Sequence, residues 1–168
     1  KNLKKLKFEN IHKKGKVVLN KYERDLLQEV LVMGLYLLQD VRRNVYFNTK
    51  FIKYSVYQKL TIEKQEQNNY LVWGRGENKF FSFGDWKNSK SRGRQIVQIT
   101  NKKLIMIIKL WAKFNKDKYN KPILYNQRGK QMTTNNLTKY LKKIFSPTGK
   151  IITSTLLRKL SISQDKNQ

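Results

Sequence analysis

The sequence contains no cysteine and only one histidine, His12, among its 168 residues. The absence of cysteine excludes disulfides, thiolate zinc sites and thiol catalysis. A single histidine leaves no histidine-based metal site and no triad that depends on an imidazole base. Most common catalytic chemistries are therefore excluded, and neither a metal nor another cofactor is expected.

Long apolar runs are also missing, because no stretch approaches the roughly 18 uninterrupted apolar residues of a membrane-spanning helix. The longest apolar stretch, residues 26–38, is interrupted by Gln28 and Glu29 and predicts a buried helix. Hydrophobic residues make up 39% and aromatic residues 12% of the chain, which is enough to build a core. The length is that of about one domain.

Acidic residues are scarce: 11 Asp and Glu stand against 37 Lys and Arg, and the formal net charge is +26. Self-repulsion at this level opposes a compact state, so an acidic partner is expected to offset it. Nucleic acid is favoured, because every phosphate that the protein neutralises releases a counterion. An anionic membrane is disfavoured, since the basic residues are not gathered beside one amphipathic helix.

Part of this charge has an explanation that involves no function. Lysine supplies 29 of the basic residues, and the chain has 16 asparagines but a single alanine, Ala112, which is typical of an AT-rich genome. Two alternatives to DNA therefore stay open. One is an RNA-binding or ribosomal protein, and the other is a scaffold whose basic face docks an acidic protein.

The N-terminal stretch starts at Lys1 instead of methionine, so the sequence is expected to be a piece of a longer protein. This stretch is basic and has no apolar segment of the kind found in a signal peptide. A basic sequence without cysteine fits a nuclear or a cytoplasmic compartment, and the lysine clusters KKLK and KKGK, which could serve as an import signal, favour the nucleus. Neither membrane attachment nor a small-molecule substrate is expected.

Apolar residues at helical spacing predict a first helix over residues 21–39, with Asn20 as its N-cap. The period then changes, and short aromatic or β-branched runs predict a small antiparallel sheet of three or four strands. The segments Gly74-Arg75-Gly76 and Ser91-Arg92-Gly93 are hairpin signals within it. The predicted strands are residues 51–57, 70–73, 80–83 and 95–99.

Three more helices are predicted after the sheet. The first covers residues 101–114 with Thr100 as its cap, the second starts after Thr133 or Thr134 and ends at Phe145, and the third starts near Thr153 or Ser154. The sequence therefore predicts a mostly helical α+β domain over residues 20–163. A basic arm, residues 1–19, precedes this domain, and a polar tail, residues 164–168, follows it.

This order of elements, and three motifs placed on it, resemble the catalytic domain of tyrosine recombinases, the phage-integrase family. The segment LYLLQDVRRNVYF resembles the leucine-rich helix that ends at the family's first catalytic arginine, with Arg42 the closer match and Arg43 the alternative. The segment FGDWKNSKSRGRQIVQIT resembles the family's lysine-bearing hairpin, with Lys87 at the lysine position. The segment TLLRK resembles the HxxR element, with Arg158 as its arginine.

The resemblance implies a pocket in which Arg42, Lys87 and Arg158 surround one phosphate. In the family, arginines hold the non-bridging oxygens through forked hydrogen bonds, and the lysine protonates the leaving 5′ oxygen. Without any chemistry, such a pocket still binds a phosphate of double-stranded DNA. The predicted nucleic-acid-binding residues, which include the donors at the hairpin tip, are Arg42, Arg43, Lys87, Lys90, Arg92, Arg94, Arg158 and Lys159.

Two departures from the family pattern bear on catalysis. Thr155 stands in place of the HxxR histidine, and the last tyrosine, Tyr140, precedes Arg158 instead of following it, so the family's nucleophile is missing from this sequence. The resemblance then implies a degenerate, non-catalytic member that binds duplex DNA beside other protein subunits of a nuclear assembly. A DNA adenine methyltransferase complex of a ciliate is one setting that fits the composition. The alternative is an active recombinase whose nucleophile lies beyond residue 168.

Several of these residues also have ordinary structural explanations. Arg42 suits the negative end of a helix dipole, and Arg158 would be satisfied by an ion pair with Asp40 or Asp85. The aromatic residues around the predicted hairpins could stack on bases, but their strand spacing favours a place in the core. These aromatic residues are Trp73, Phe80, Phe81, Phe83 and Trp86.

Overall fold

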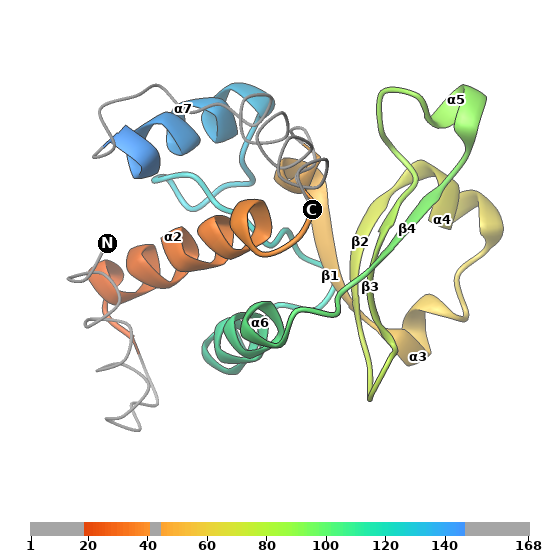
Figure 1. Ribbon diagram of the computed structural model, residues 1–168, viewed down its shortest axis with the longest axis horizontal. Helices are drawn as coiled ribbons and strands as arrows, with labels where there is room; N and C mark the ends of the chain where they lie inside the picture. Colours follow the sequence, from red (N-terminus) through yellow and green to blue (C-terminus); the bar gives the residue numbers. More distant parts are fainter. Residues whose placement is uncertain (1–18, 41–44, 147–168) are drawn as a thin grey trace, which may run out of the picture.

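A computed structural model of the chain describes residues 19–40 and 45–146 (Figure 1). All of the N-terminal arm except its last residue, Leu19, lies outside the described residues, as do the helix expected near Thr153 and the polar tail. The α+β class is confirmed. The elements are α2 (Lys21–Leu37), a 3₁₀ turn η1 (Tyr46–Asn48), β1 (Thr49–Lys53), α3 (Tyr54–Tyr57), α4 (Ile62–Gln67), β2 (Asn69–Trp73), β3 (Lys79–Phe83), α5 (Ser89–Arg92), β4 (Gln95–Gln98), α6 (Lys102–Phe114) and α7 (Thr134–Phe145).

The four strands form one mixed sheet in the order β1-β2-β3-β4. The pairs β2–β3 and β3–β4 are antiparallel, whereas β1 runs parallel to β2, with Phe51 opposite Leu71. The prediction of an antiparallel sheet is therefore wrong for β1. A parallel pair needs a crossover connection of a dozen or more residues, and residues 54–68, which contain α3 and α4, provide it.

The crossover was not predictable from its own pattern. Residues 54–57, expected as the end of the first strand, form the helical turn α3. Helix α4 has the polar sequence IEKQEQ and buries none of its residues, so it carries no apolar period. The hydroxyl of Thr61 caps it by accepting a hydrogen bond from the amide of Lys64.

The sheet separates two hydrophobic layers, with α3 and α4 on one face and α2, α6 and α7 on the other (Figure 1). Alternate strand residues face opposite layers. Phe81 and Phe83 join the larger core beneath α2 and α6, while Tyr70 and Phe80 pack with Tyr57 of α3 in the smaller one. The expectation that the aromatic residues build the core is confirmed, since Trp73 and Trp86 also pack against the larger cluster.

Helix α2 packs against α6, and the two helices approach closely at Gly34. A side-chain carbon at this position would lie 3.1 Å from Cδ1 of Leu104 and 3.2 Å from Cδ1 of Ile107. The tight approach joins the two most apolar helices into one layer over the sheet. None of the helices in the described ranges has both the length and the hydrophobicity needed to cross a bilayer.

The helix caps follow the sequence closely. Asn20 and Glu23 form a reciprocal capping box at the start of α2, and Thr133 and Asn136 form another at the start of α7. The cap of α6 is Asn101, whose Oδ1 accepts from the amides of Lys103 and Leu104 at 3.0 and 3.1 Å. The prediction of Thr100 as this cap is therefore wrong by one residue.

This cap assignment gives a stability prediction. We expect Asn101→Ala to lower the free energy of unfolding by about 1 kcal/mol, because two amides of the first turn lose their acceptor. Thr100→Ala, one residue earlier, should leave stability within about 0.5 kcal/mol of the wild type. Urea unfolding followed by circular dichroism measures both, and a larger loss for Thr100→Ala would contradict the assignment.

Candidate nucleic-acid interface

The predicted binding residues divide into two groups. Lys87, Lys90, Arg92 and Arg94 lie on the connection between β3 and β4, residues 84–94, which contains α5. The others lie outside the described residues, so their convergence into one phosphate pocket stays a prediction. The residues of this second group are Arg42, Arg43, Arg158 and Lys159. Thr155, which stands in place of the histidine of the HxxR element, also lies outside the described residues.

The side chain of Asn69 holds the start of this connection, at Asp85, against the sheet. Asn69 is the first residue of β2 and is 1% exposed. Its Oδ1 accepts from the amide of Asp85 at 2.9 Å, and its Nδ2 donates to the carbonyl of Asp85 at 2.9 Å and to Oδ1 of Asn48 at 2.8 Å. Asn48 in turn donates to the Asp85 carboxylate at 3.1 Å. The connection therefore leaves the sheet in a fixed direction.

The distal half of the connection is closed by Trp86, whose indole nitrogen donates to the carbonyl of Gly93 at 2.8 Å. Gly93 has a φ of 73°, a left-handed conformation that favours glycine. Lys87, Lys90 and Arg92 are exposed around this closed loop. Their charges are therefore accessible to a polyanion, and contact of this tip with a DNA groove stays a prediction.

Arg94 is held differently from the other three basic residues of the connection. Its guanidinium donates to the hydroxyl of Tyr57 and to Oε1 of Gln65, both on the crossover between β1 and β2. The Tyr57 hydroxyl also shares a hydrogen bond of 2.8 Å with Oγ of Ser82. Arg94 therefore links the β3–β4 connection to the crossover. These two segments are distant in the sequence, so the role of Arg94 depends on the tertiary fold.

Helix α6 presents a row of positive charge that its spacing predicts. Lys102, Lys109 and Lys113 recur at intervals of seven and four residues and are exposed, opposite the face that packs on α2. We call these residues, with the exposed Lys103, the α6 basic face. The whole segment 101–146 carries twelve lysines and arginines against one acidic residue, Asp117. By contrast, residues 19–40 carry two basic and four acidic residues.

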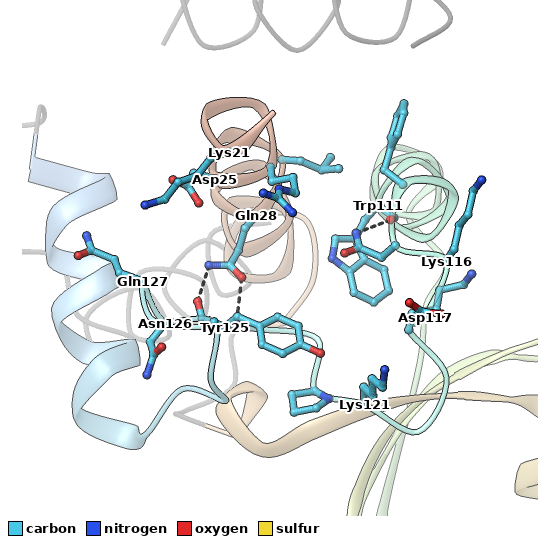
Figure 2. Close-up of a pocket in the computed structure, with 17 residues that line it drawn as sticks. Lys21, Asp25, Gln28, Trp111, Lys116, Asp117, Lys121, Tyr125, Asn126 and Gln127 are labelled. Carbon is cyan, nitrogen blue, oxygen red and sulfur yellow. Dashed lines mark hydrogen bonds between the residues drawn. The ribbon is translucent and has the colours of Figure 1, made fainter. Parts of the chain in front are cut away.

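A cleft lies between the N-terminal half of α2, the C-terminal end of α6 and the loop that follows α6 (Figure 2). Its volume is about 490 Å³. Five cationic side chains and two acidic ones, Asp25 and Asp117, line it. The cationic residues are Lys21, Arg24, Lys116, Lys118 and Lys121. We call this the α2–α6 cleft.

Within the α2–α6 cleft, the side chain of Gln28 holds the main chain of Tyr125 through two hydrogen bonds. Its side-chain amide donates to the carbonyl of Tyr125 at 3.0 Å and accepts from the amide of Tyr125 at 2.9 Å. Figure 2 shows the Tyr125 ring extending from this clamp into the space below Trp111, toward Lys121. Sequence reasoning missed this cleft, because the residues that form it come from segments about a hundred positions apart.

A second cleft of about 630 Å³ adjoins the first between α2 and α7, and Tyr140 lines it. Burial, and secondly the negative charge of Glu29, raise the pKa of the Tyr140 hydroxyl well above its ordinary value. The phenol therefore stays protonated at neutral pH.

Tyr36 and Tyr46, which stand on either side of residues 41–44 in the sequence, are both buried. Burial, and secondly the neighbouring Tyr46, raise the pKa of Tyr36 well above its ordinary value. Gln39 donates to the Tyr46 hydroxyl at 2.8 Å. The Tyr36 hydroxyl therefore stays neutral at physiological pH, and the amide of Gln39 carries no charge.

No cluster of three or more histidine, aspartate or glutamate side chains suited to a metal ion occurs within residues 19–40 and 45–146. Comparisons with models of protein families, with curated proteins and with solved structures give no match to the chain. Function therefore has to follow from the residues and their arrangement.

Proposed function

We propose that the chain is a non-catalytic domain that binds duplex DNA through its phosphates, with little sequence selectivity of its own. The observation that carries this proposal is the α6 basic face, four exposed lysines along one helix in a segment with a single acidic residue. In this proposal the domain serves as an accessory subunit of a larger nuclear assembly that acts on DNA.

The dimensions of the α6 basic face suit a phosphate backbone. Lys102 and Lys113 are eleven residues apart, which corresponds to about 16 Å along a helix. At about 3.4 Å of rise per base pair, this length spans roughly five base pairs. Lysine ammonium groups act as point charges on phosphate and do not read bases in a fixed geometry. The expected binding is therefore strongly dependent on salt and tolerant of sequence.

The choice of a binding role over a catalytic one rests on residue types. In the resemblance, Thr155 stands in place of the family's histidine, and the last tyrosine of this sequence, Tyr140, precedes Arg158 instead of following it. The resemblance to tyrosine recombinases favours duplex DNA over RNA as the polyanion. The order of a leucine-rich helix, a small sheet with a basic hairpin and further helices agrees with that resemblance, although the parallel β1–β2 pair was not expected from it.

The test is binding to a duplex of ~20 base pairs over a salt series. Lys109→Gln/Lys113→Gln should bind more weakly, and the slope of log affinity against log salt should become shallower by about 1.8, because each lost phosphate contact contributes roughly 0.9. The matched control is Lys59→Gln/Lys64→Gln, which removes two exposed lysines from the crossover on the other face of the sheet. Its slope should remain that of the wild type.

Two outcomes would contradict the proposal. Equal slope changes in both double variants would mean that the charge acts diffusely and that α6 makes no defined contact. Tighter binding to a structured RNA of the same length than to the duplex would instead support the RNA-binding alternative.

A further inference from the structure

The α2–α6 cleft combines positive charge with an aromatic ring inside one concave space. We propose that it is a second nucleic-acid site, separate from the α6 basic face, and that it takes one unpaired nucleotide unit. In this site the lysines and Arg24 hold the phosphate, and the ring of Tyr125 stacks on the base. The inference goes beyond the proposed duplex binding, because a base-paired nucleotide does not expose its face to a ring.

The charge of the cleft is available to a ligand. No hydrogen bond or ion pair with another described residue engages the side chains of Lys21, Arg24, Lys116 or Lys121. Lys118 is partly engaged, since its ammonium lies 4.5 Å from the centre of the Tyr119 ring. The five cations exceed the two carboxylates of the cleft by three charges, which suits a phosphate or phosphodiester.

The Tyr125 ring is presented by a rigid backbone. Both polar groups of its main chain are bonded by Gln28, as described above. The next residue, Asn126, closes a tight turn, because its Oδ1 accepts from the amides of Arg128 and Lys130 at 2.9 and 3.1 Å. Little freedom is then lost when a base stacks on the ring, and stacking is the usual way in which proteins hold unpaired bases.

The size of the cleft limits what fits. A volume of about 490 Å³ lies within the range of small-ligand sites, and it admits one nucleotide but not a base-paired duplex. The nucleotide unit could belong to a single strand or be free in solution. Both sources present the same chemistry, an aromatic base joined to a phosphate, and the experiment separates them.

The probe is a fluorescent single-stranded oligothymidylate of ~12 nucleotides, which forms no duplex with itself. Tyr125→Ala should weaken its binding about tenfold, because the stacking surface is lost while the main-chain clamp to Gln28 is kept. Tyr125→Phe should bind like the wild type, since the ring remains. Lys121→Gln should weaken binding several-fold, whereas Lys59→Gln, with the same change in charge, should leave it unchanged.

Competition with ATP identifies the source of the nucleotide. Displacement of the oligonucleotide from the wild type, with a tenfold loss of ATP affinity in Tyr125→Ala, supports a site for free nucleotides. Failure of ATP to compete, with the same loss for the oligonucleotide, supports a site for a strand. Both results agree with the proposed chemistry.

Wild-type affinity of Lys121→Gln for the oligonucleotide would overturn the inference, and so would wild-type affinity of a folded Tyr125→Ala. Lys121 is exposed, so its variant tests the site even where Tyr125→Ala fails to fold. A failure here leaves the α6 basic face untouched, because duplex binding is measured separately with the Lys109 and Lys113 variants. Conversely, loss of the duplex result would leave the Tyr125 result standing.

Discussion

Gly84→Ala is expected to lower the free energy of unfolding by about 3 kcal/mol or more. A side-chain carbon at this position would lie 2.3 Å from the carbonyl oxygen of Gln65 and 2.5 Å from the carbonyl carbon of Glu66. These are backbone atoms of α4, so they cannot move aside as the end of a side chain would. The amide of Gly84 also donates to the carbonyl of Asn68 at 3.0 Å, and the clash would break this bond. Urea unfolding at neutral pH measures the loss.

Gly76→Ala is the matched control for this prediction. Gly76 has a φ of 56° in the turn between β2 and β3, and nothing lies within 4 Å of the position that its side-chain carbon would take. Its substitution should therefore add only the strain of a left-handed alanine, about 1 kcal/mol. If Gly84→Ala were no worse than Gly76→Ala, the close contact of the β3–β4 connection with α4 would be absent in solution.

The elements that the sequence predicted well are those that local residue patterns determine, such as apolar spacing, helix caps and turn glycines. Helix α2 has a broad apolar face and a capping box at Asn20, and its observed end at Leu37 lies two residues from the expected one. Helix α7 begins after Thr133 and ends at Phe145, both as predicted. The turn at residues 74–78 joins an antiparallel pair, as its glycines indicate.

The elements that were missed depend on tertiary contacts. Helix α4 is short and polar, and it is held through its caps and its approach to Gly84 instead of an apolar stripe. No residue pattern indicates that β1 pairs in parallel with β2, because the crossover that joins the two strands sets the direction of pairing. The same limit applies to single side chains. Arg94 was expected at a free loop tip, yet its partners are Tyr57 and Gln65, 37 and 29 positions away.

The two candidate sites differ in the same way, because one depends on a local pattern and the other on tertiary contacts. The α6 basic face could be read from sequence, since lysines at intervals of four and seven on a helix share a side. The α2–α6 cleft could not, because it joins Lys21 to Lys121 across a hundred residues. Of the aromatic residues that line this cleft, Tyr125 lies in a loop rich in lysine and asparagine, whose composition resembles that of many solvent-exposed loops.

Asn69→Leu is expected to destabilise the fold by about 3 kcal/mol and to loosen the β3–β4 connection. The substitution preserves volume approximately, but it removes three hydrogen bonds at once. The amide and carbonyl of Asp85 and the side chain of Asn48 then lose their partner, and each buried polar group left unpaired costs about 1 to 3 kcal/mol. Asn69→Asp should be worse, because a buried carboxylate cannot donate to these acceptors and would lie beside Asp85.

The neighbouring variant Asn68→Leu is the matched control, because Asn68 makes one side-chain bond, 2.9 Å to the carbonyl of Lys64, in a more exposed setting. Its stability should stay within about 1 kcal/mol of the wild type. Hydrogen exchange gives the second readout: amides of residues 85–94 should exchange faster in Asn69→Leu, and those of α6 should not. Faster exchange in this connection with weaker duplex binding would mean that Lys87, Lys90 and Arg92 act from a fixed platform. Unchanged exchange there would contradict the anchoring role of Asn69, since the connection would then hold its shape through Trp86 and Arg94 alone.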